Sequence, residues 1–386
     1  MRVLIGAATD FGAELFGGIA SYVHDLTEEW RSTLDVTLLG ISGVARKPDR
    51  IGPRKILLSS TVKLPSNRLA LSSAILMNRR QLEGLAPDVL YAHSSEIGLA
   101  MSVASPGVPL VMHVHGTEST LRSSRFRLAR SRLASATYGS FVQLPSFRRA
   151  ASIIITADER RYVSFVDTLP STIQRKCLRI PSMVNLKRYA APVPDQGSAA
   201  PLRLISVGRL VPRKGFHTVL RAVAWLRERG GDVTLRIVGD GPERVALECL
   251  TAELGLSKAV TFVGFIPRER MCLQLSNAQI FVSGSVQEGF SMSMLESLAS
   301  GVPVVGFDVG GLAEIACDGR SGAVSDEETP AGLARAIQSI VPVTTPMRMS
   351  CVAVAQRYSS VGIAGLIRSV LEDAAGARAG VTVVAP

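Results

Sequence analysis

The sequence predicts an α/β protein built from two doubly wound domains, and three observations support this prediction. The chain has 386 residues, which is enough for two domains that each bury a hydrophobic core. Short and almost continuously apolar runs alternate with segments of helical period, as expected of parallel strands covered on both faces. Two stretches also begin alike, with an apolar strand, a glycine-bearing turn and an amphipathic helix.

The first of these stretches opens the chain. The run VLIGAA predicts a buried strand, and FGAELFGG supplies the turn. The segment that follows predicts a helix, because its apolar residues fall at helical spacing: Ile19, Tyr22, Val23, Leu26 and Trp30. Further strands of this half are predicted for the runs DVTLLG, DVLYAH, PLVMHVHG and SIIITA.

The second stretch repeats this order in the second half of the chain. LRLISVGRL predicts a strand, VPRKG a turn, and FHTVLRAVAWLRE a helix that Gly230 and Gly231 end. Further strands are predicted for TLRIVG, AVTFVG, AQIFVSG and PVVGFD, and a last helix is predicted over residues 352–374.

The boundary between the two domains is predicted in residues 190–201, AAPVPDQGSAAP, which are rich in Pro, Ala and Gly and have no periodicity. We therefore expect a first domain over residues 1–192, completed by the helix at 352–374, and a second domain over residues 200–345.

Composition and charge limit the functional classes. No apolar run has the length of a membrane span, and we interpret the first residues as a buried strand rather than a signal peptide. The five cysteines are odd in number and scattered, which favours a reducing, cytoplasmic setting. Residues 1–200 hold 25 Lys and Arg against 15 Asp and Glu, whereas residues 201–386 hold 18 against 17. The first half thus carries +10 of the net +11, which indicates an anionic partner such as nucleic acid or an acidic membrane surface, and a merely solvated basic surface is the alternative.

Ligands of open parallel sheets bind at the carboxyl ends of the strands, and this rule selects the candidate residues. Gly17 and Gly18 precede the first helix, whose free N–H groups can hold a phosphate, although a plain tight turn explains them equally well. Arg209 follows a strand, and Lys214 lies five residues later beside Gly215. Two such cations suit a diphosphate, and solvated surface charge is the alternative.

The segment EGFSMSMLES holds two glutamates. Glu288 is expected in the loop after the strand AQIFVSGS, and Glu296 inside the helix that follows. Each carboxylate can accept hydrogen bonds from a pair of sugar hydroxyls, whereas an acid that merely complements the helix dipole is the alternative. The N–H groups at the helix start, those of Ser291, Met292 and Ser293, are expected to point at a phosphate or a sugar.

Three histidines end strand-like runs in the first half: His93, His113 and His115. His113 and His115 alternate on one strand and can share a face, but no carboxylate or cysteine joins them at a ligand spacing, so we expect no metal. A single histidine that hydrogen-bonds a sugar or an oxyanion is the preferred interpretation, and His115, followed by Gly116, is the candidate.

In this order, the motifs resemble those of the retaining, nucleotide-sugar-dependent glycosyltransferases of the GT-B fold (glycosyltransferase family four, the group 1 type), which include bacterial mannosyltransferases and enzymes of glycogen and sucrose synthesis. The resemblance covers most of the chain and is carried by these segments: FGGIASYV, DVLYAH, VMHVHG, SIIITADERR, SVGRLVPRKG, RIVGDGPER, VTFVGFIPRER, EGFSMSMLESLASGVPVVGFDVGGLAEI and DGRSG.

The resemblance implies two Rossmann-like domains that face each other across a cleft, the second of which binds the donor. It implies that Arg209 and Lys214 neutralise a diphosphate, that Glu288 holds sugar hydroxyls and that Glu296 holds the ribose. Gly18 would approach the phosphates, and His115 would contact the transferred sugar. No metal or cofactor is implied, because the nucleotide diphosphate sugar is a co-substrate and the cations supply the charge. The expected reaction is hexose transfer, with retention, to a hydroxyl of a glycan or lipid-linked acceptor in bacterial polysaccharide or glycolipid synthesis.

An arginine-rich stretch at residues 122–149 predicts a contact with an anionic membrane surface. It holds seven arginines and no acid, with aromatic and leucine residues between them. The arginines occupy no single helical face, so a solvated basic loop is the alternative. Membrane contact would place the enzyme in the cytoplasm, peripherally on the inner face of the cell membrane, near a lipid-linked acceptor.

Two other classes of protein fit the sequence less well. An NAD-dependent two-domain oxidoreductase needs a complete G-x-G-x-x-G fingerprint, but in VGDGPERV the third glycine is replaced by Arg244. A nucleic-acid-binding protein would be motivated by charge alone, and aromatic residues make up only 5% of the chain, so we expect no nucleic-acid partner.

Overall fold

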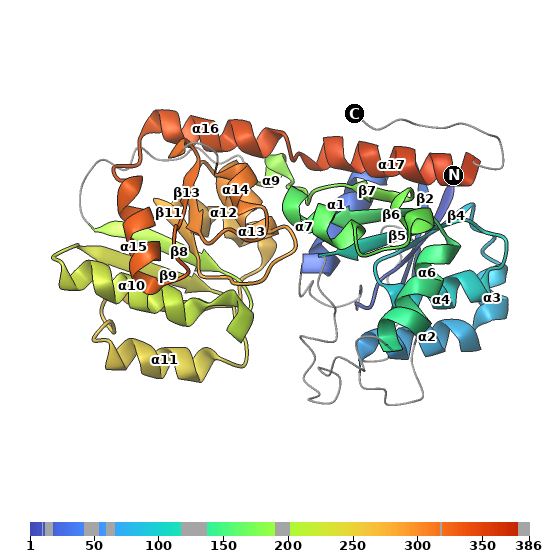
Figure 1. Ribbon diagram of the computed structural model, residues 1–386, viewed down its shortest axis with the longest axis horizontal. Helices are drawn as coiled ribbons and strands as arrows, with labels where there is room; N and C mark the ends of the chain where they lie inside the picture. The colour runs from blue at the N-terminus through green and yellow to red at the C-terminus, as the bar shows by residue number, and fades with distance from the viewer. Residues whose placement is uncertain are drawn as a thin grey trace. The chain divides into compact units, whose positions relative to one another are not determined.

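The computed structural model describes residues 1–9, 11, 18–41, 54–58, 66–116, 137–189, 201–316 and 319–376. The chain divides into two compact units, one made of Met1–Pro181 with Val361–Pro386 and one made of Ser182–Ser360. Each unit holds one parallel sheet with helices on both faces (Figure 1). The predicted fold class, two doubly wound α/β domains, is therefore confirmed.

The sheet of the first unit has seven strands in the order β3-β2-β1-β4-β5-β6-β7, and all neighbouring strands are parallel. Because the strand order runs outward in both directions from β1 and β4, it reverses between these two strands. The strands are β1 (Arg2–Gly6), β2 (Asp35–Ile41), β3 (Arg54–Leu58), β4 (Val89–Ala92), β5 (Leu110–His115), β6 (Ala150–Thr156) and β7 (Cys177–Arg179).

Helices cover both faces of this sheet. One face packs on α2, α4 and α6, whose apolar side chains form a single cluster with those of the central strands. On the other face, α1 buries Tyr22, Val23, Leu26 and Trp30, and the Trp30 indole N–H donates to the Ala364 carbonyl of α17 at 3.1 Å. The helices are α1 (Gly18–Trp30), α2 (Asn67–Met77), α3 (Arg79–Glu83), α4 (Ser95–Ala104), η2 (Gly139–Gln143), α6 (Leu144–Arg149), α7 (Glu159–Val166), α8 (Ser171–Gln174) and α17 (Ser360–Gly376).

The sheet of the second unit has six parallel strands in the order β10-β9-β8-β11-β12-β13, so its order reverses between β8 and β11. This arrangement is that of a dinucleotide-binding Rossmann sheet, in which a ligand crosses the carboxyl ends of the two central strands. The strands are β8 (Leu202–Val207), β9 (Val233–Val238), β10 (Val260–Gly264), β11 (Ile280–Ser283), β12 (Val304–Gly306) and β13 (Gly322–Val324).

Two apolar clusters lie on the two faces of the second sheet. One joins the strands to α10 and α15, and the other joins them to α12, α13 and α16 (Figure 1). The helices are α9 (Leu186–Tyr189), η3 (Pro212–Lys214), α10 (Phe216–Glu228), α11 (Arg244–Glu253), α12 (Arg268–Ser276), α13 (Met292–Ala299), α14 (Leu312–Ile315), α15 (Pro330–Ser339) and α16 (Thr345–Gln356).

The structure differs from the sequence prediction at the C-terminus. The single helix expected over residues 352–374 is two helices, α16 and α17, and only α17 joins the first unit. The break has a physical cause, because the intervening backbone pairs with Val184 instead of continuing a helix. The Val184 amide donates to the Tyr358 carbonyl at 2.9 Å, and the Ser360 amide donates to the Val184 carbonyl at 2.8 Å.

The same pairing explains why the boundary between the units lies at residues 181 and 182 rather than near residue 192. Val184 and Tyr189 are fully buried in the apolar cluster of the second unit, so this segment belongs to that core. Most of the predicted boundary, residues 190–200, lies outside the described residues. In the described part of the chain, every helix is too short or too polar to span a lipid bilayer.

Candidate active site

The loop after β8 and the loop after β11 form the candidate donor site, at the point where the order of the second sheet reverses. η3 places Arg213 and Lys214 in the first loop, and the second loop runs from Gly284 to α13. Gly215 has a left-handed backbone, φ 60° and ψ 30°, and a Cβ there would overlap the carbonyl oxygen of Gly284. Only glycine fits this position. Because it has no side chain, the loop after β8 can contact the loop after β11.

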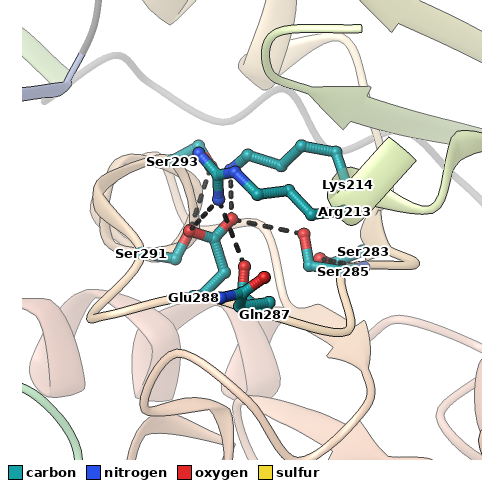
Figure 2. A network of polar contacts seen from close by, with 8 residues as sticks. All are labelled: Arg213, Lys214, Ser283, Ser285, Gln287, Glu288, Ser291 and Ser293. Atoms are coloured by element: carbon teal, nitrogen blue, oxygen red, sulfur yellow. Dashed lines mark hydrogen bonds and ion pairs between the residues drawn. The ribbon is translucent and has the colours of Figure 1, made fainter. Parts of the chain in front are cut away.

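Glu288 lies at the centre of a polar network that joins these loops (Figure 2). Its carboxylate forms an ion pair with the Lys214 ammonium, lies 3.5 Å from the Arg213 guanidinium, and accepts a hydrogen bond from the Ser285 hydroxyl at 3.2 Å. The side chains of Glu288 and Lys214 are only 11% and 16% exposed, whereas that of Arg213 is 44% exposed. The network therefore presents one largely buried carboxylate beside two cations.

The turn at Gly310 and Gly311 supports this network from one side. Both glycines have left-handed backbones, with φ of 65° and 82°. A Cβ on Gly310 would lie 2.6 Å from the Cβ of Glu288, and one on Gly311 would lie 2.6 Å from the ring of Phe290. The Glu288 loop is thus packed against bare backbone, and a side chain on either glycine would displace it.

Helix α13 begins directly after this loop, as predicted. Ser291, Met292 and Ser293 form its start, and Glu296 lies inside the helix. One expectation is wrong: the Ser291 N–H does not point to an open site, because it donates to the Gly310 carbonyl at 3.0 Å. The reason is that the glycine turn lies directly against the helix start. The Ser291 and Ser293 hydroxyls are 3.1 Å apart and share a hydrogen bond.

Glu296 faces a second cation that the sequence analysis missed. The Arg268 guanidinium, on the first turn of α12, lies 3.5 Å from the Glu296 carboxylate, and these side chains are 16% and 11% exposed. Burial raises the pKa of the Tyr189 phenol well above its usual value, and the nearby Glu296 carboxylate raises it further. The signal that could have found Arg268 is its position, because it is the first charged residue after the strand and turn VTFVGFIP.

Arg209 is placed differently from Lys214. Its side chain is exposed, and within the described part of the chain it has no ion pair or hydrogen bond. Arg213, which the sequence analysis did not select, forms the ion pair with Glu288 instead. The structure therefore brings Lys214, Glu288 and Arg213 together and leaves the Arg209 side chain in solvent.

The GDG segment after β9 has a structural explanation. Cβ atoms on Gly239 and Gly241 would overlap the carbonyl oxygens of Gly208 and Leu210. The Leu210 amide donates to the Asp240 carbonyl at 3.0 Å, which fixes the backbone beside Arg209. These glycines therefore allow two loops of the second unit to pack closely, and they give no support to a dinucleotide fingerprint.

Three histidines of the first unit, His93, His113 and His115, form a stack at the carboxyl ends of β4 and β5. The ring centroids of His113 and His115 are 4.1 Å apart, and those of His93 and His115 are 5.0 Å apart. Tyr22 of α1 meets all three rings edge-on. The predicted shared face of His113 and His115 is thus confirmed, and His93 joins them from the neighbouring strand.

Hydrogen bonds fix the protons of His113. The Thr156 hydroxyl donates to the Ile180 carbonyl at 2.9 Å, so its oxygen accepts from His113 Nε2 at 2.7 Å. His113 Nδ1 is then bare and accepts from the Tyr91 hydroxyl at 2.5 Å. Both ring nitrogens are therefore occupied within the protein.

This arrangement argues against a metal site at the histidine stack. One nitrogen from each of His93, His113 and His115 lies within 4.8 Å of the others, which is a spacing that a metal could use. Both nitrogens of His113 are already hydrogen-bonded, however, and His93 Nδ1 lies 2.7 Å from His115 Nε2. A metal would have to break these bonds before it could bind.

Burial keeps the stack neutral. It lowers the pKa of His93 and His113 well below the usual histidine value, and the neighbouring His115 lowers both further. Burial, followed by the Arg68 charge, lowers the pKa of His115 to about 3. At neutral pH the three rings are therefore uncharged hydrogen-bonding groups.

Two further sequence predictions concern residues of which the structure describes only a part. Gly18 is the first residue of α1 and faces open space, whereas Gly17 lies outside the described residues. Of the arginine-rich stretch at 122–149, residues 122–136 lie outside the described residues. In the remainder, Arg148 and Arg149 are exposed at the end of α6, and Phe141 of η2 is 74% exposed.

Family models match both halves of the chain. "Glycosyl transferases group 1" matches residues 197–356, and "Glycosyl transferase 4-like domain" matches residues 17–168. The chain is a glycosyltransferase of the family that these two models describe. It is a nucleotide-sugar glycosyltransferase of the GT-B type, and the comparisons give the oxidoreductase alternative no support.

Curated relatives of this glycosyltransferase include sugar transferases with different substrates. The chain is 27% identical, over 89% of its length and 90% of the relative's, to the GDP-mannose-dependent alpha-(1-6)-phosphatidylinositol monomannoside mannosyltransferase of Mycolicibacterium smegmatis. It is 26% identical to the 2-deoxystreptamine glucosyltransferase of Streptomyces kanamyceticus over 52% of its own length, and this match spans about half (54%) of the relative.

Solved structures share the fold of the glycosyltransferase over nearly its whole length. Sucrose-phosphate synthase from Thermosynechococcus elongatus superposes with a TM-score of 0.83 at 21% identity, over 97% of this chain and 99% of that chain. Anabaena HepE, in complex with UDP and glucose, gives a TM-score of 0.73 at 20% identity, over 96% and 99% of the two chains.

Proposed function

We propose that this glycosyltransferase moves a hexose from a nucleotide diphosphate sugar to a hydroxyl of a glycan or a lipid-linked acceptor, and that the anomeric configuration is retained. The observation that carries the proposal is the network of Glu288 with Lys214 and Arg213 at the reversal point of the second sheet. The carboxylate can accept hydrogen bonds from the sugar hydroxyls of such a donor, and the neighbouring cations can bind its diphosphate.

The cations form the diphosphate half of this proposal. Lys214 is a compact point charge held in place by Glu288, and Arg213 is a planar fork that is partly exposed and can meet a pair of phosphate oxygens. Arg209, whose side chain is free in solvent in the described part of the chain, is available as a third positive group. Together they would stabilise the charge that develops on the leaving nucleotide diphosphate.

The carboxylates form the sugar half. Glu288 would accept hydrogen bonds from hydroxyls of the transferred hexose, and Glu296 would accept them from the ribose. Arg268 holds the Glu296 side chain in one position, because it pairs with this carboxylate in a largely buried setting. The N-terminus of α13, with Met292 and Ser293, supplies further N–H donors to phosphate or sugar oxygens.

The reaction that we propose breaks the bond between the anomeric carbon and the phosphate oxygen and forms a bond between this carbon and the acceptor oxygen on the same face. The intermediate state resembles an oxocarbenium ion paired with the departing diphosphate. The acceptor hydroxyl loses its proton to that diphosphate, so Glu288 binds and polarises without acting as a nucleophile. His115 would hydrogen-bond the transferred sugar near its reacting carbon.

Transfer would proceed without a bound metal. Lys214, Arg213 and the start of α13 already provide the positive field that a divalent cation would supply to a diphosphate. Turnover measured in EDTA and in added Mg²⁺ tests this directly. Equal rates are expected, and a rate that EDTA abolishes and Mg²⁺ restores would contradict the proposal.

We further propose that the enzyme acts in the cytoplasm, peripherally on the inner membrane face, in polysaccharide or glycolipid synthesis. The mannosyltransferase relative is named for a phosphatidylinositol substrate, and Phe141, Arg148 and Arg149 expose an aromatic ring and two cations in the described part of the basic stretch. Sedimentation with liposomes that contain or lack anionic lipid tests the contact, with binding expected only to the anionic vesicles.

Turnover of a panel of UDP-, GDP- and ADP-sugars, followed by the nucleotide released, tests the function itself. Glu288→Gln removes the charge and keeps the size, so we expect at least a hundredfold lower kcat/KM, equivalent to about 3 kcal/mol of transition-state stabilisation. Glu327→Gln is the matched control, because Glu327 also pairs with an arginine in this unit but at its surface. Equal loss in both variants, or turnover of none of the sugars, would refute the proposal.

A further inference from the structure

His93 is a buried histidine to which the proposed reaction gives no role. It follows β4 directly, its amide donates to the Gly6 carbonyl at 3.0 Å, and Ser94 caps α4 immediately after it. Its side chain is 4% exposed and stacks on His115. His93 Nδ1 lies 2.7 Å from His115 Nε2, so a single proton lies between these two nitrogens.

Two proton arrangements satisfy this bond. Either His93 Nδ1–H donates to a bare His115 Nε2, or His115 Nε2–H donates to a bare His93 Nδ1. Because the rings are neutral, each arrangement also fixes the other nitrogen of each ring. In the first, His115 carries its proton on Nδ1 and offers a donor to a ligand. In the second, His115 offers only an acceptor.

The surroundings of His93 Nε2 decide between the arrangements. This atom is buried and has no hydrogen-bond partner among the described residues. In the second arrangement it would carry a proton that has no acceptor, and buried N–H groups without an acceptor are rarer in proteins than buried acceptors without a donor. In the first arrangement it is a bare nitrogen, which leaves no donor unsatisfied at this atom.

A 180° rotation of the His93 or the His115 ring does not provide a third arrangement. Tyr22 meets His93, His113 and His115 edge-on, with ring centroids 6.2, 5.1 and 5.1 Å away. His113, stacked against His115, is held at both nitrogens by Tyr91 and Thr156. Turning the His93 or the His115 ring over would also replace a bonded nitrogen by a carbon and lose the hydrogen bond at 2.7 Å, so His115 keeps the orientation in which Nε2 faces His93.

We propose that His93 is a positioning residue that donates its Nδ1 proton to His115 and thereby fixes His115 as the Nδ1–H tautomer. His115 then serves as a neutral hydrogen-bond donor, and its partner on the substrate is an acceptor oxygen, either of a sugar hydroxyl or of a phosphate. The tautomer assignment stands on the hydrogen-bond geometry of neutral rings, and its use in catalysis rests on the proposed function.

The assignment is tested by NMR on protein labelled with ¹⁵N-histidine, in which two-bond proton–nitrogen correlations reveal which ring nitrogen carries the proton. The chain has five histidines, so each ring can be assigned by a single substitution. We expect His115 to be protonated on Nδ1 and His113 on Nε2. A wild-type His115 protonated on Nε2 would overturn the proposal.

Two variants at position 93 test the cause. Asn places an amide N–H close to the position of Nδ1, so His93→Asn should leave the His115 tautomer unchanged. His93→Phe keeps a stacked ring without the donor, so His115 should revert to the Nε2–H form that an unconstrained histidine prefers. His113 is the internal control, and its tautomer should be the same throughout. An unchanged His115 tautomer in a folded Phe variant would refute the role of His93.

Kinetics then connect the tautomer to the reaction. His93→Phe should lower kcat by about a hundredfold, as expected for the loss of one aligned donor, while KM for the nucleotide sugar changes by less than about threefold. His93→Asn should keep most of the activity. A wild-type rate in the Phe variant would refute the catalytic use. Absence of turnover in the wild type, with the NMR result intact, would instead refute the proposed function. Should the Phe variant not fold, the wild-type spectrum still decides the tautomer.

Discussion

The buried histidines predict an acid-sensitive first unit. His93 and His113 have pKa values well below the usual histidine value because they are buried, and an unfolded chain restores that usual value of about 6.5. Below pH 6.5 the unfolded state therefore binds protons that the folded state does not. By linkage, the free energy of unfolding must fall as the pH falls.

The size of the effect follows from the unfolded pKa. Each histidine that stays neutral in the folded state lowers the free energy of unfolding by about 2 kcal/mol between pH 7 and pH 5. His93 and His113 together therefore lower it by about 4 kcal/mol. His115, whose pKa is lowered to about 3, also stays neutral at pH 5 and adds a similar loss. The Asp88 carboxyl, whose pKa is lowered mainly by a hydrogen bond from the Arg2 backbone, loses its contribution only at lower pH.

Urea unfolding followed by tryptophan fluorescence measures this loss. The chain has two tryptophans, Trp30 in the first unit and Trp225 in the second, so a Trp225→Phe variant reports on the first unit alone. His113→Gln removes one titrating group and should reduce the loss between pH 7 and 5 by about 2 kcal/mol, whatever its stability at pH 7. A free energy of unfolding that is flat over this range, or an equal loss in both proteins, would refute the reasoning.

Three further predictions concern the second unit. Gly215→Ala places a Cβ against the Gly284 carbonyl and puts a non-glycine residue in a left-handed conformation. The free energy of unfolding should therefore fall by more than about 2 kcal/mol in urea titrations. The control Gly365→Ala, whose Cβ would enter open space on α17, should not destabilise the protein. Gly310→Ala should displace Glu288 and lower kcat/KM at least tenfold without unfolding the protein, and an unaltered rate would show that this turn does not position the carboxylate. Arg268→Met should raise KM for the nucleotide sugar about tenfold in turnover assays, because Glu296 loses its cation, and an unchanged KM would argue against a role for this pair in donor binding.

The sequence predicted most of the parallel strands and the loops of the candidate site, because both follow from local patterns. Apolar runs such as LRLISV are strands wherever they are covered on both faces, and the ends of β8 and β11 must then lie side by side. This is why Lys214 and Glu288 could be selected from their positions after these strands. Three edge strands, β3, β7 and β13, escaped detection. RKILL begins with charges, and CLR and GAV hold only three residues each.

The partners of the selected residues could not be predicted, because they depend on rotamers and on packing between segments distant in sequence. Arg213 rather than Arg209 meets Glu288, since the single turn of η3 directs it there. Arg268 meets Glu296 across a separation of 28 residues. Likewise, the bond between His93 and His115 requires the register of β4 against β5, which no local pattern in the chain encodes.

The close approach of Gly215 and Gly284 limits how this enzyme can diversify. Each glycine meets backbone of the other's loop, so a larger residue at one position cannot be accommodated by trimming a side chain at the other. Insertions or deletions in either loop would separate them. New donor preferences in descendants of this protein should therefore arise through exchanges of side chains around an inherited, unaltered backbone junction.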